Sequence, residues 1–334
     1  MQNSNTNIDP IHKFYNIERK ERQILELFSE LCDKGNIVSI EQLFLVIPNL
    51  KLITFNEHIN LSQNEHLYIS EGLNKAFNKK FYNIVSFILN NIPSIFFTIH
   101  DKFFLACREN NIELINIFID ILSSQISLSL FINTHDFLFR LSEEFNHAAL
   151  NNKLDVMRII RNFNQNITIK YNDIIQNSCQ KGYVDIIRFL YDINRDIDFS
   201  FKDQKFFHTA CEYGFLDIVE FILDVRNDID IFNCKNKAIK DACINNHCNV
   251  LQFLFQKANE SDENIKKKFD FQSLLECYCV AVNNENIEIF KTIQLFNENR
   301  IHKIPLNIRN KNIHDIQRIE NFTKQNSSIK FLFI

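Results

Sequence analysis

The chain has 334 residues, of which 46% are hydrophobic and 23% charged, and its formal net charge is −4 at pH 7. This composition supplies enough apolar material for a continuous core, and the charge gives the chain as a whole no electrostatic footprint for nucleic acid. With only four glycines and four prolines, the chain is unlike a globular enzyme built on tight loops. Because no apolar run approaches the length of about 18 residues, we expect no membrane-spanning helix.

The N-terminal residues 1–10, MQNSNTNIDP, are polar and predicted to be disordered. They lack the charged start and apolar core of a secretory signal. Nine cysteines, an odd number, fit a reducing compartment. We therefore expect a cytoplasmic protein.

One sequence phrase recurs through residues 11–299. In residues 206–223 it reads FFHTACEYGFLDIVEFIL, and we take the small residue at its centre, Cys211, as its anchor. Anchors separated by 45, 30, 42, 30, 32, 32 and 39 residues fall at Cys32, Phe77, Cys107, Ala149, Cys179, Cys211, Cys243 and Val282. A period of roughly 30 to 33 residues is typical of a repeat array, and the longer intervals predict insertions at 49–60, 123–137 and 256–270.

Each repeat predicts two helices. The third residue after the anchor is glycine or asparagine in six units: Gly35, Asn110, Asn152, Gly182, Gly214 and Asn246. These residue types accept the left-handed backbone that ends a helix. The sixth residue after the anchor is Asn, Asp or Glu in seven of the eight units, and it predicts the start of a second helix because such side chains bond to free amides and suit the helix dipole. Apolar residues at positions seven, eight, ten and eleven give this helix one buried stripe.

This unit resembles the ankyrin repeat. Residues 207–211, Phe-His-Thr-Ala-Cys, followed by Gly214 and by Asp-Ile-Val at 217–219, are similar to that family's Leu-His-x-Ala-Ala, Gly and Glu-Ile-Val. The resemblance covers roughly residues 25–295 and implies an all-α solenoid of about seven or eight helix-turn-helix units. The chain departs from the family in lacking Thr-Pro before the first helices, in having the family's His only at His208, and in lacking Gly-Ala after the second helices.

The resemblance implies a non-catalytic module that binds a partner protein on its concave face. That face is formed by first-helix positions just before the turn, which here are Leu105, Arg108, Glu109, His147, Asn151, Asn177, Gln180, Lys181, Thr209, Glu212, Tyr213, Asp241 and Asn245. Arg108 and Tyr213 are the leading candidates, because Arg and Tyr are enriched at binding hot spots. The alternative is an ordinary polar face. We expect a monomer, and degenerate repeats of this composition also resemble arrays of intracellular bacteria, large DNA viruses and protists, which suggests a host-directed role.

Two other functions compete with protein binding. An enzyme could build its site from the insertions and the C-terminal segment, which contain the scattered residues His58, His66, His135, His302 and His314. The segment 300–334 is the other candidate, with seven Lys and Arg against two Asp and Glu. It could be a basic tail that binds nucleic acid or anionic lipid, or a solvated cap of the array, which we favour.

The sequence offers two weak constellations for chemistry. Cys243, His247 and Cys248 lie within six residues, but their spacing matches no strong zinc-ligand pattern. Four cysteines at the anchor position read instead as small buried hydrophobes: Cys107, Cys179, Cys211 and Cys243. Cys211 with His208 could form a nucleophile and base, but the resemblance implies that His208 is structural and bonds to neighbouring backbone. We therefore predict no catalytic residue, no metal and no cofactor.

Overall fold

The computed structural model describes residues 23–46, 63–92, 96–124, 134–260, 271–298 and 313–326. Every regular element in these ranges is an α-helix, which confirms the predicted all-α class. The chain divides into two compact units, Met1–Ile169 and Lys170–Ile334, which we call the N-terminal and C-terminal units. The predicted disordered segment 1–10 and most of the predicted insertions lie outside the described residues.

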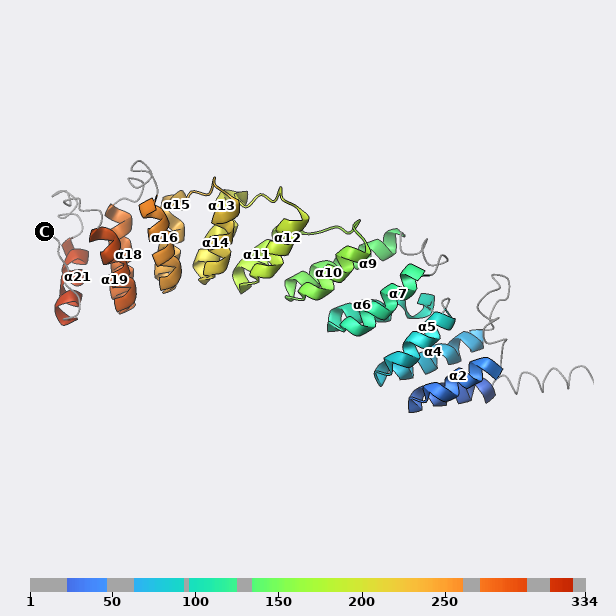
Figure 1. Ribbon diagram of the computed structural model, residues 1–334. Helices are drawn as coiled ribbons and strands as arrows, with labels where there is room; N and C mark the ends of the chain where they lie inside the picture. Colours follow the sequence, from blue (N-terminus) through green and yellow to red (C-terminus); the bar gives the residue numbers. More distant parts are fainter. Residues whose placement is uncertain are drawn as a thin grey trace, which may run out of the picture. The chain divides into compact units, whose positions relative to one another are not determined.

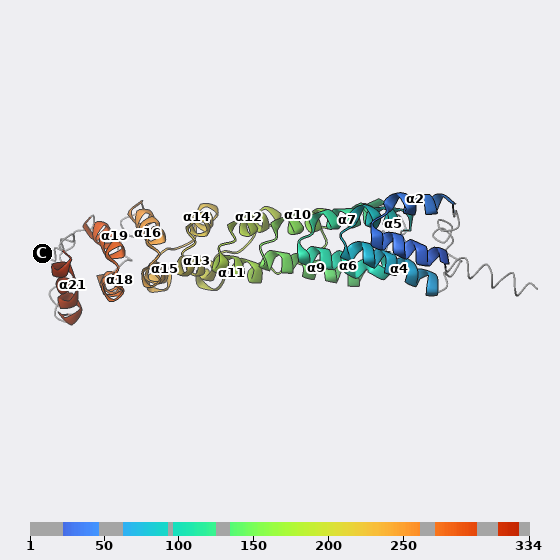
Figure 2. The ribbon, with the colours of Figure 1, turned by 90° about the horizontal axis from the view of Figure 1, so that it is seen from below.

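The N-terminal unit is a stack of helix pairs. Residues 23–34 form a first helix, and the elements that follow are α2 (Ile37–Val46), α4 (Gln63–Asn78), α5 (Tyr82–Asn91), α6 (Phe96–Glu109), α7 (Ile112–Ser124), α9 (His135–Leu150) and α10 (Leu154–Phe163). Within the unit, α4, α6 and α9 lie in one layer, and α2, α5, α7 and α10 lie in the other (Figures 1 and 2). Each repeat therefore contributes one helix to each layer.

The C-terminal unit continues the same pattern. Its elements are α11 (Tyr171–Lys181), α12 (Val184–Ile193), α13 (Phe201–Tyr213), α14 (Leu216–Val225), α15 (Asn233–Ile244), α16 (Cys248–Glu260), α18 (Phe271–Asn283), α19 (Ile287–Glu298) and α21 (Ile313–Gln325). The last helix, α21, packs against α18 without a described second helix of its own. Its residues Ile319 and Phe322 are buried, and the ring of Phe322 lies 5.4 Å from that of Phe290. Residues 313–326 thus close the stack as half a repeat.

The turn inside each helix pair follows the prediction. The third residue after the anchor has a positive φ in all eight repeats: Gly35 72°, Lys80 61°, Asn110 59°, Asn152 57°, Gly182 78°, Gly214 79°, Asn246 62° and Glu285 53°. The next backbone amide donates to the carbonyl just before the anchor, as Phe215 N does to Ala210 O at 3.0 Å. This bond satisfies a carbonyl that the helix end would leave unpaired. Lys80 and Glu285 adopt the conformation without the residue types that predict it.

The predicted start of the second helix is wrong by one residue. Every second helix begins five residues after the anchor, so the Asn, Asp or Glu at position six lies inside the first turn. There its charge suits the helix dipole, but it is not the capping residue. The cap lies two residues earlier, where the side chains of Asn36, Asn111 and Asn286 accept from the amides of Ser39, Leu114 and Ile289 at 3.0–3.2 Å.

The core runs between the two layers. Seven of the eight anchors are buried, which confirms the cysteines among them as small core residues. The exception is Val282 in α18, which is half-buried. Alanine or serine precedes the anchor in most units, as at Ala210 and Ser178, and both are fully buried. These small side chains let neighbouring first helices approach closely.

In two places, buried polar side chains attach a repeat to the connector that follows it. In the N-terminal unit, Ser142 Oγ accepts from Thr168 N at 2.9 Å and Asn146 Nδ2 donates to Thr168 O at 3.1 Å. In the C-terminal unit, the Gln204 amide donates to Asp230 O and accepts from Asp230 N, both at 2.9 Å. Because buried backbone groups are costly when unpaired, these bonds fix the register between repeats.

Candidate partner-binding surface

The predicted binding residues share one face of the first helices. They lie two residues before the anchor and one or two residues after it, so a spacing of three to four residues brings them onto the same side of each helix. We call this surface, at the ends of α6, α9, α11, α13 and α15 that precede the left-handed turn, the first-helix face. Its exposed members are Leu105, Arg108, Glu109, His147, Asn151, Gln180, Lys181, Glu212, Tyr213 and Asn245.

Three predicted residues are less accessible than the rest. Thr209 is only 6% exposed, and its hydroxyl accepts from Gln176 Nε2 on the neighbouring helix α11 at 3.0 Å. The expectation that Thr209 presents its side chain to a partner is therefore wrong, because α11 covers it. Asn177 and Asp241 are half-buried. Asp241 pairs with Lys237 at 2.6 Å, one turn away on the same helix.

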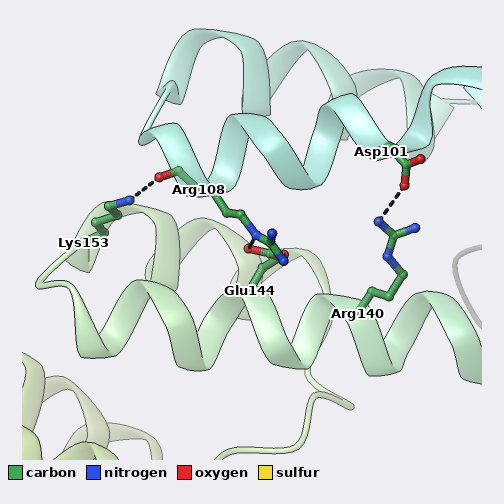
Figure 3. A network of polar contacts seen from close by, with 5 residues as sticks. All are labelled: Asp101, Arg108, Arg140, Glu144 and Lys153. Carbon is green, nitrogen blue, oxygen red and sulfur yellow. Dashed lines mark hydrogen bonds and ion pairs between the residues drawn. The ribbon is translucent and has the colours of Figure 1, made fainter.

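In the N-terminal unit, ion pairs cross the first-helix face between α6 and α9 (Figure 3). Arg108 Nη2 lies 2.7 Å from Glu144 Oε1, and Arg108 Nε donates to both oxygens of that carboxylate. Glu144 is only 3% exposed, whereas the Arg108 side chain is 62% exposed. The hydrogen bonds to Glu144 raise the pKa of the Arg108 guanidinium. Arg108 thus compensates a buried charge, a structural task that prediction from residue type had missed.

Two further contacts join the same helices. Arg140 pairs with Asp101 at 2.6 Å, and its guanidinium also lies 4.2 Å from the centre of the Phe104 ring. Lys153 Nζ donates to the carbonyl of Arg108 at the end of α6. This part of the first-helix face is therefore tied together by charged side chains of the chain itself.

In the C-terminal unit, two large apolar side chains are exposed on adjacent first helices. Tyr213 on α13 is 46% exposed and Ile244 on α15 is 51% exposed, and these helices pack against each other. Tyr213 was predicted, but Ile244 was missed. Ile244 occupies the position that Arg108, Gln180 and Glu212 occupy in other units, so the repeat register itself was the signal that could have found it.

His208 lies near the backbone of Asp203, which by itself raises its pKa, but its ring forms no hydrogen bond of ordinary geometry with a described residue. It is 4% exposed, and neither ring nitrogen has a hydrogen-bond partner among the described residues. Burial, together with the nearby charge of Lys237, lowers the pKa of His208.

The buried cysteines at the anchor positions are unsuited to nucleophilic chemistry. Burial raises the pKa of the Cys107 and Cys179 thiols to about 12, and it raises that of Cys211 well above its ordinary value. These thiols stay protonated, and the thiolate is the reactive form. His247, proposed from sequence as a weak zinc ligand, instead lies with Nε2 2.9 Å from the carbonyl of Glu212. No cluster of three or more metal-binding side chains occurs in the described ranges.

Comparison with known families finds a match to ankyrin repeats. Two overlapping ranges, residues 145–233 and 178–267, match a family model that describes three consecutive ankyrin repeats, and no curated protein shows significant similarity to the chain. The matched residues contain the regular helix pairs from the end of α9 to α16. Residues 145–267 are thus similar to ankyrin repeats, and the helix pairs and left-handed turns of the other described repeats support an ankyrin-repeat fold. Modules of this class are generally protein–protein interaction modules. No helix in the described part of the chain is long and apolar enough to cross a membrane.

Proposed function

We propose that the chain is a non-catalytic protein-binding module and that the first-helix face of α11, α13 and α15 takes the partner. The observation that carries this proposal is the exposure of Tyr213 and Ile244 on adjacent helices. Large apolar side chains grouped on a surface favour interaction sites, and tyrosine is enriched at binding hot spots. A partner that covers both side chains gains the free energy of burying them.

Polar residues surround this apolar pair. Gln180 and Lys181 lie at the end of α11, Glu212 adjoins Tyr213 on α13, and Asn245 follows Ile244 at the end of α15. An apolar centre with a polar rim is the usual composition of a protein interface. Because the rim carries both Lys181 and Glu212, it favours no single sign of charge in the partner.

The competing functions have less support. For the pair Cys211 and His208, the raised pKa of the thiol and the lowered pKa of the imidazole leave both groups neutral near pH 7, without a thiolate to attack a substrate. For the C-terminal segment, the described helix α21 carries Arg318 and Lys324 against Asp315 and Glu320, so its charges cancel. The basic excess of residues 300–334 lies outside the described residues. A host-directed role rests on composition alone and stays a prediction.

The proposal is tested by proximity labelling in cells with the wild type and the double variant Tyr213→Ala/Ile244→Ala. We expect a specific set of labelled proteins to be lost in the variant, while its circular dichroism and melting temperature stay close to wild type because both residues are exposed. The matched control is Val38→Ala/Leu45→Ala on α2, which removes side chains that are 59% and 75% exposed. Identical labelling by the wild type and the Tyr213/Ile244 variant would exclude this face as the binding site.

A further inference from the structure

In the described structure, successive turns of the array are in contact through one side chain. At several repeats, the residue four positions after the anchor reaches back to the left-handed turn of the preceding repeat. Where that turn has glycine, the residue is a ring: Phe81 lies on Gly35, Phe215 on Gly182 and His247 on Gly214. A Cβ at any of these glycines would collide with the ring, so the absence of a side chain is what makes room for it.

A second contact accompanies the first. The carbonyl one residue after the anchor, which ends a first helix and has no partner inside it, accepts a side-chain donor from the next repeat. Lys79 Nζ donates to Asp33 O at 2.9 Å, His247 Nε2 lies 2.9 Å from Glu212 O, and Asn284 Nδ2 donates to Ile244 O at 3.3 Å. Lys153 makes the same contact with Arg108 O. We call the junction between one repeat and the next a step. At the steps named above, a side chain of the later repeat gives the turn of the earlier repeat a hydrogen-bond donor, a ring or both.

The step between α4 and α6 lacks both contacts. Its turn residue is Lys80, with φ 61°. The residue of the next repeat that would contact this turn is Asn111. Asn111 is short and engaged elsewhere: its Nδ2 donates to Tyr82 Oη at 2.5 Å and its Oδ1 accepts from Leu114 N at 3.2 Å. No described residue donates a hydrogen bond to the carbonyl of Asn78, which is the equivalent acceptor here.

A groove of about 860 Å³ lies at this turn, between Lys80 and Asn111. Phe77, Leu105, Ala106 and Ile112 form its apolar wall, and Leu105 is 44% exposed. Lysine and glutamate side chains share the rim: Lys80, Lys102, Glu109 and Glu113. The volume is within the range of about 300 to 1,000 Å³ for binding clefts. Because the rim charges are balanced, a ligand is selected by its apolar shape and its hydrogen-bond donor.

We propose that this groove binds a segment of a partner protein by accepting a tyrosine or tryptophan side chain. The ring lies in the groove beside the Lys80 side chain, against Phe77 and Leu105, and not directly over the turn backbone as Phe81 and Phe215 do where the turn residue is glycine. Its O–H or N–H donates to the carbonyl of Asn78, in the same way as His247 Nε2 contacts the carbonyl of Glu212. Tyrosine and tryptophan combine both features in one side chain. The inference rests on the proposed protein-binding function but uses a separate site, in the N-terminal unit.

The probe is a phage-displayed library of random linear peptides, panned on the full chain, with affinities of enriched peptides measured by fluorescence polarisation. The main variant is Lys80→Gly/Asn111→Phe, which recreates inside the chain the glycine and ring of the other steps. It loses an Asn cap and gains a glycine at a left-handed position, so we expect it to fold with a melting temperature near that of the wild type. Its matched control is Asn246→Gly/Asn286→Phe, which makes the same changes at a step in the C-terminal unit.

We expect the enriched peptides to share a Tyr or Trp and to bind the filled variant at least tenfold more weakly, with less than a twofold change in the matched control. Replacing the peptide's Tyr by Phe should weaken binding about threefold by removing the donor, and replacing it by Ala at least tenfold. If the filled variant does not fold, Leu105→Gln, at an exposed helical position, replaces it and should weaken binding at least threefold.

The outcomes separate this inference from the proposed function. Peptides that are unaffected by filling the groove but lost in Tyr213→Ala/Ile244→Ala would overturn the groove and support the first-helix face of the C-terminal unit. Peptides lost on filling the groove and retained in that double variant would support the groove. Enrichment without an aromatic residue, or no enrichment at all, would overturn the groove.

Discussion

In the N-terminal unit, charged side chains join neighbouring first helices, as in the pairs Arg108–Glu144 at 2.7 Å and Arg140–Asp101 at 2.6 Å. In the C-terminal unit, the corresponding contacts between α11, α13 and α15 rely more on neutral groups: rings seated on Gly182 and Gly214, and the buried amide of Gln204. Ion pairs on the surface occupy the residues that a partner would otherwise contact. Glycine–ring and amide contacts stabilise the stack and leave Tyr213 and Ile244 exposed.

The family is recognisable mainly in the C-terminal unit, because the matched residues begin in α9 and lie mostly there. The turns do not account for this, since Gly35, Lys80, Asn110 and Asn152 of the N-terminal unit take the same left-handed conformation. The backbone turn is therefore similar in both units, while the closest sequence likeness to the family's motif, at residues 207–219, lies in the C-terminal unit.

The largest expected effect comes from the turn glycine Gly182. Its φ of 78° is unfavourable for alanine, and a Cβ there would collide with the Phe215 ring. We expect Gly182→Ala to lower the free energy of unfolding by about 3 kcal/mol, from left-handed strain together with overpacking. Urea unfolding measures the loss, and hydrogen exchange should place it in the C-terminal unit. The comparison is Asn152→Ala, where a Cβ is already present and a loss of about 1 kcal/mol or less is expected; equal losses would contradict the glycine–ring contact.

The close approach of first helices gives the next effect. Ala210 on α13 is fully buried, and Ala210→Leu should destabilise the protein by about 2 kcal/mol by forcing the helices apart. Glu220→Ala on α14 should change the stability by less than about 0.5 kcal/mol, since it shortens a half-buried side chain of the second layer and forces no helices apart. Equal melting temperatures for the two variants would refute the register of the repeats.

The ion pair of the N-terminal unit should contribute less. Arg108→Ala leaves the Glu144 carboxylate buried without its partner, and we expect a loss of about 1.5 kcal/mol, reduced from the value for fully buried pairs because the Arg108 side chain is largely exposed. The double variant Arg108→Ala/Glu144→Leu should lose less than Arg108→Ala alone, because it removes the unpaired charge. A larger loss in the double variant would show that the pair itself, rather than the orphaned carboxylate, carries the effect.

The smallest effect is a dependence on pH in the C-terminal unit. Burial and the charge of Lys237 lower the pKa of His208 in the folded state, although Asp203 and Asp241 oppose the shift. The unfolded chain then binds the proton more readily, so stability is lost as the pH falls below about 6.5. We expect a loss of about 1 kcal/mol between pH 7.5 and 5.5 that is absent in His208→Asn. Superimposable pH profiles of the two proteins would refute the assignment of this loss to His208.

Much of the local structure was predictable because it depends on contacts within one repeat. Glycine or asparagine at six turns, and apolar stripes such as Ile218, Val219, Phe221 and Ile222, predicted helix pairs that the structure contains. The second helices were placed one residue too late, because an acidic residue in the first turn and a capping residue have similar sequence signatures. Helix ends remain the least certain part of such a pattern.

The candidate surface was less predictable because it depends on contacts between repeats. Thr209 looks like an exposed polar residue until α11 is placed over it, and Arg108 looks like a binding residue until α9 brings a buried Glu144 against it. Ile244 resembles a core residue by type, but it occupies an exposed position. The groove beside Lys80 could not be seen in sequence, because it depends on how the short side chain of Asn111 is engaged by its neighbours, whereas five other repeats have a longer residue at this position.

By itself, the sequence determined the repeat length, the positions of the turns and the all-α class, since helix periodicity and left-handed turns are encoded by residues a few positions apart. Only the tertiary structure decided which polar residues bond to the neighbouring repeat and which remain exposed to a partner. The physical reason is that stacking pairs side chains some 30 to 45 residues apart, and whether a polar group faces water, a carboxylate or a backbone carbonyl depends on that neighbour.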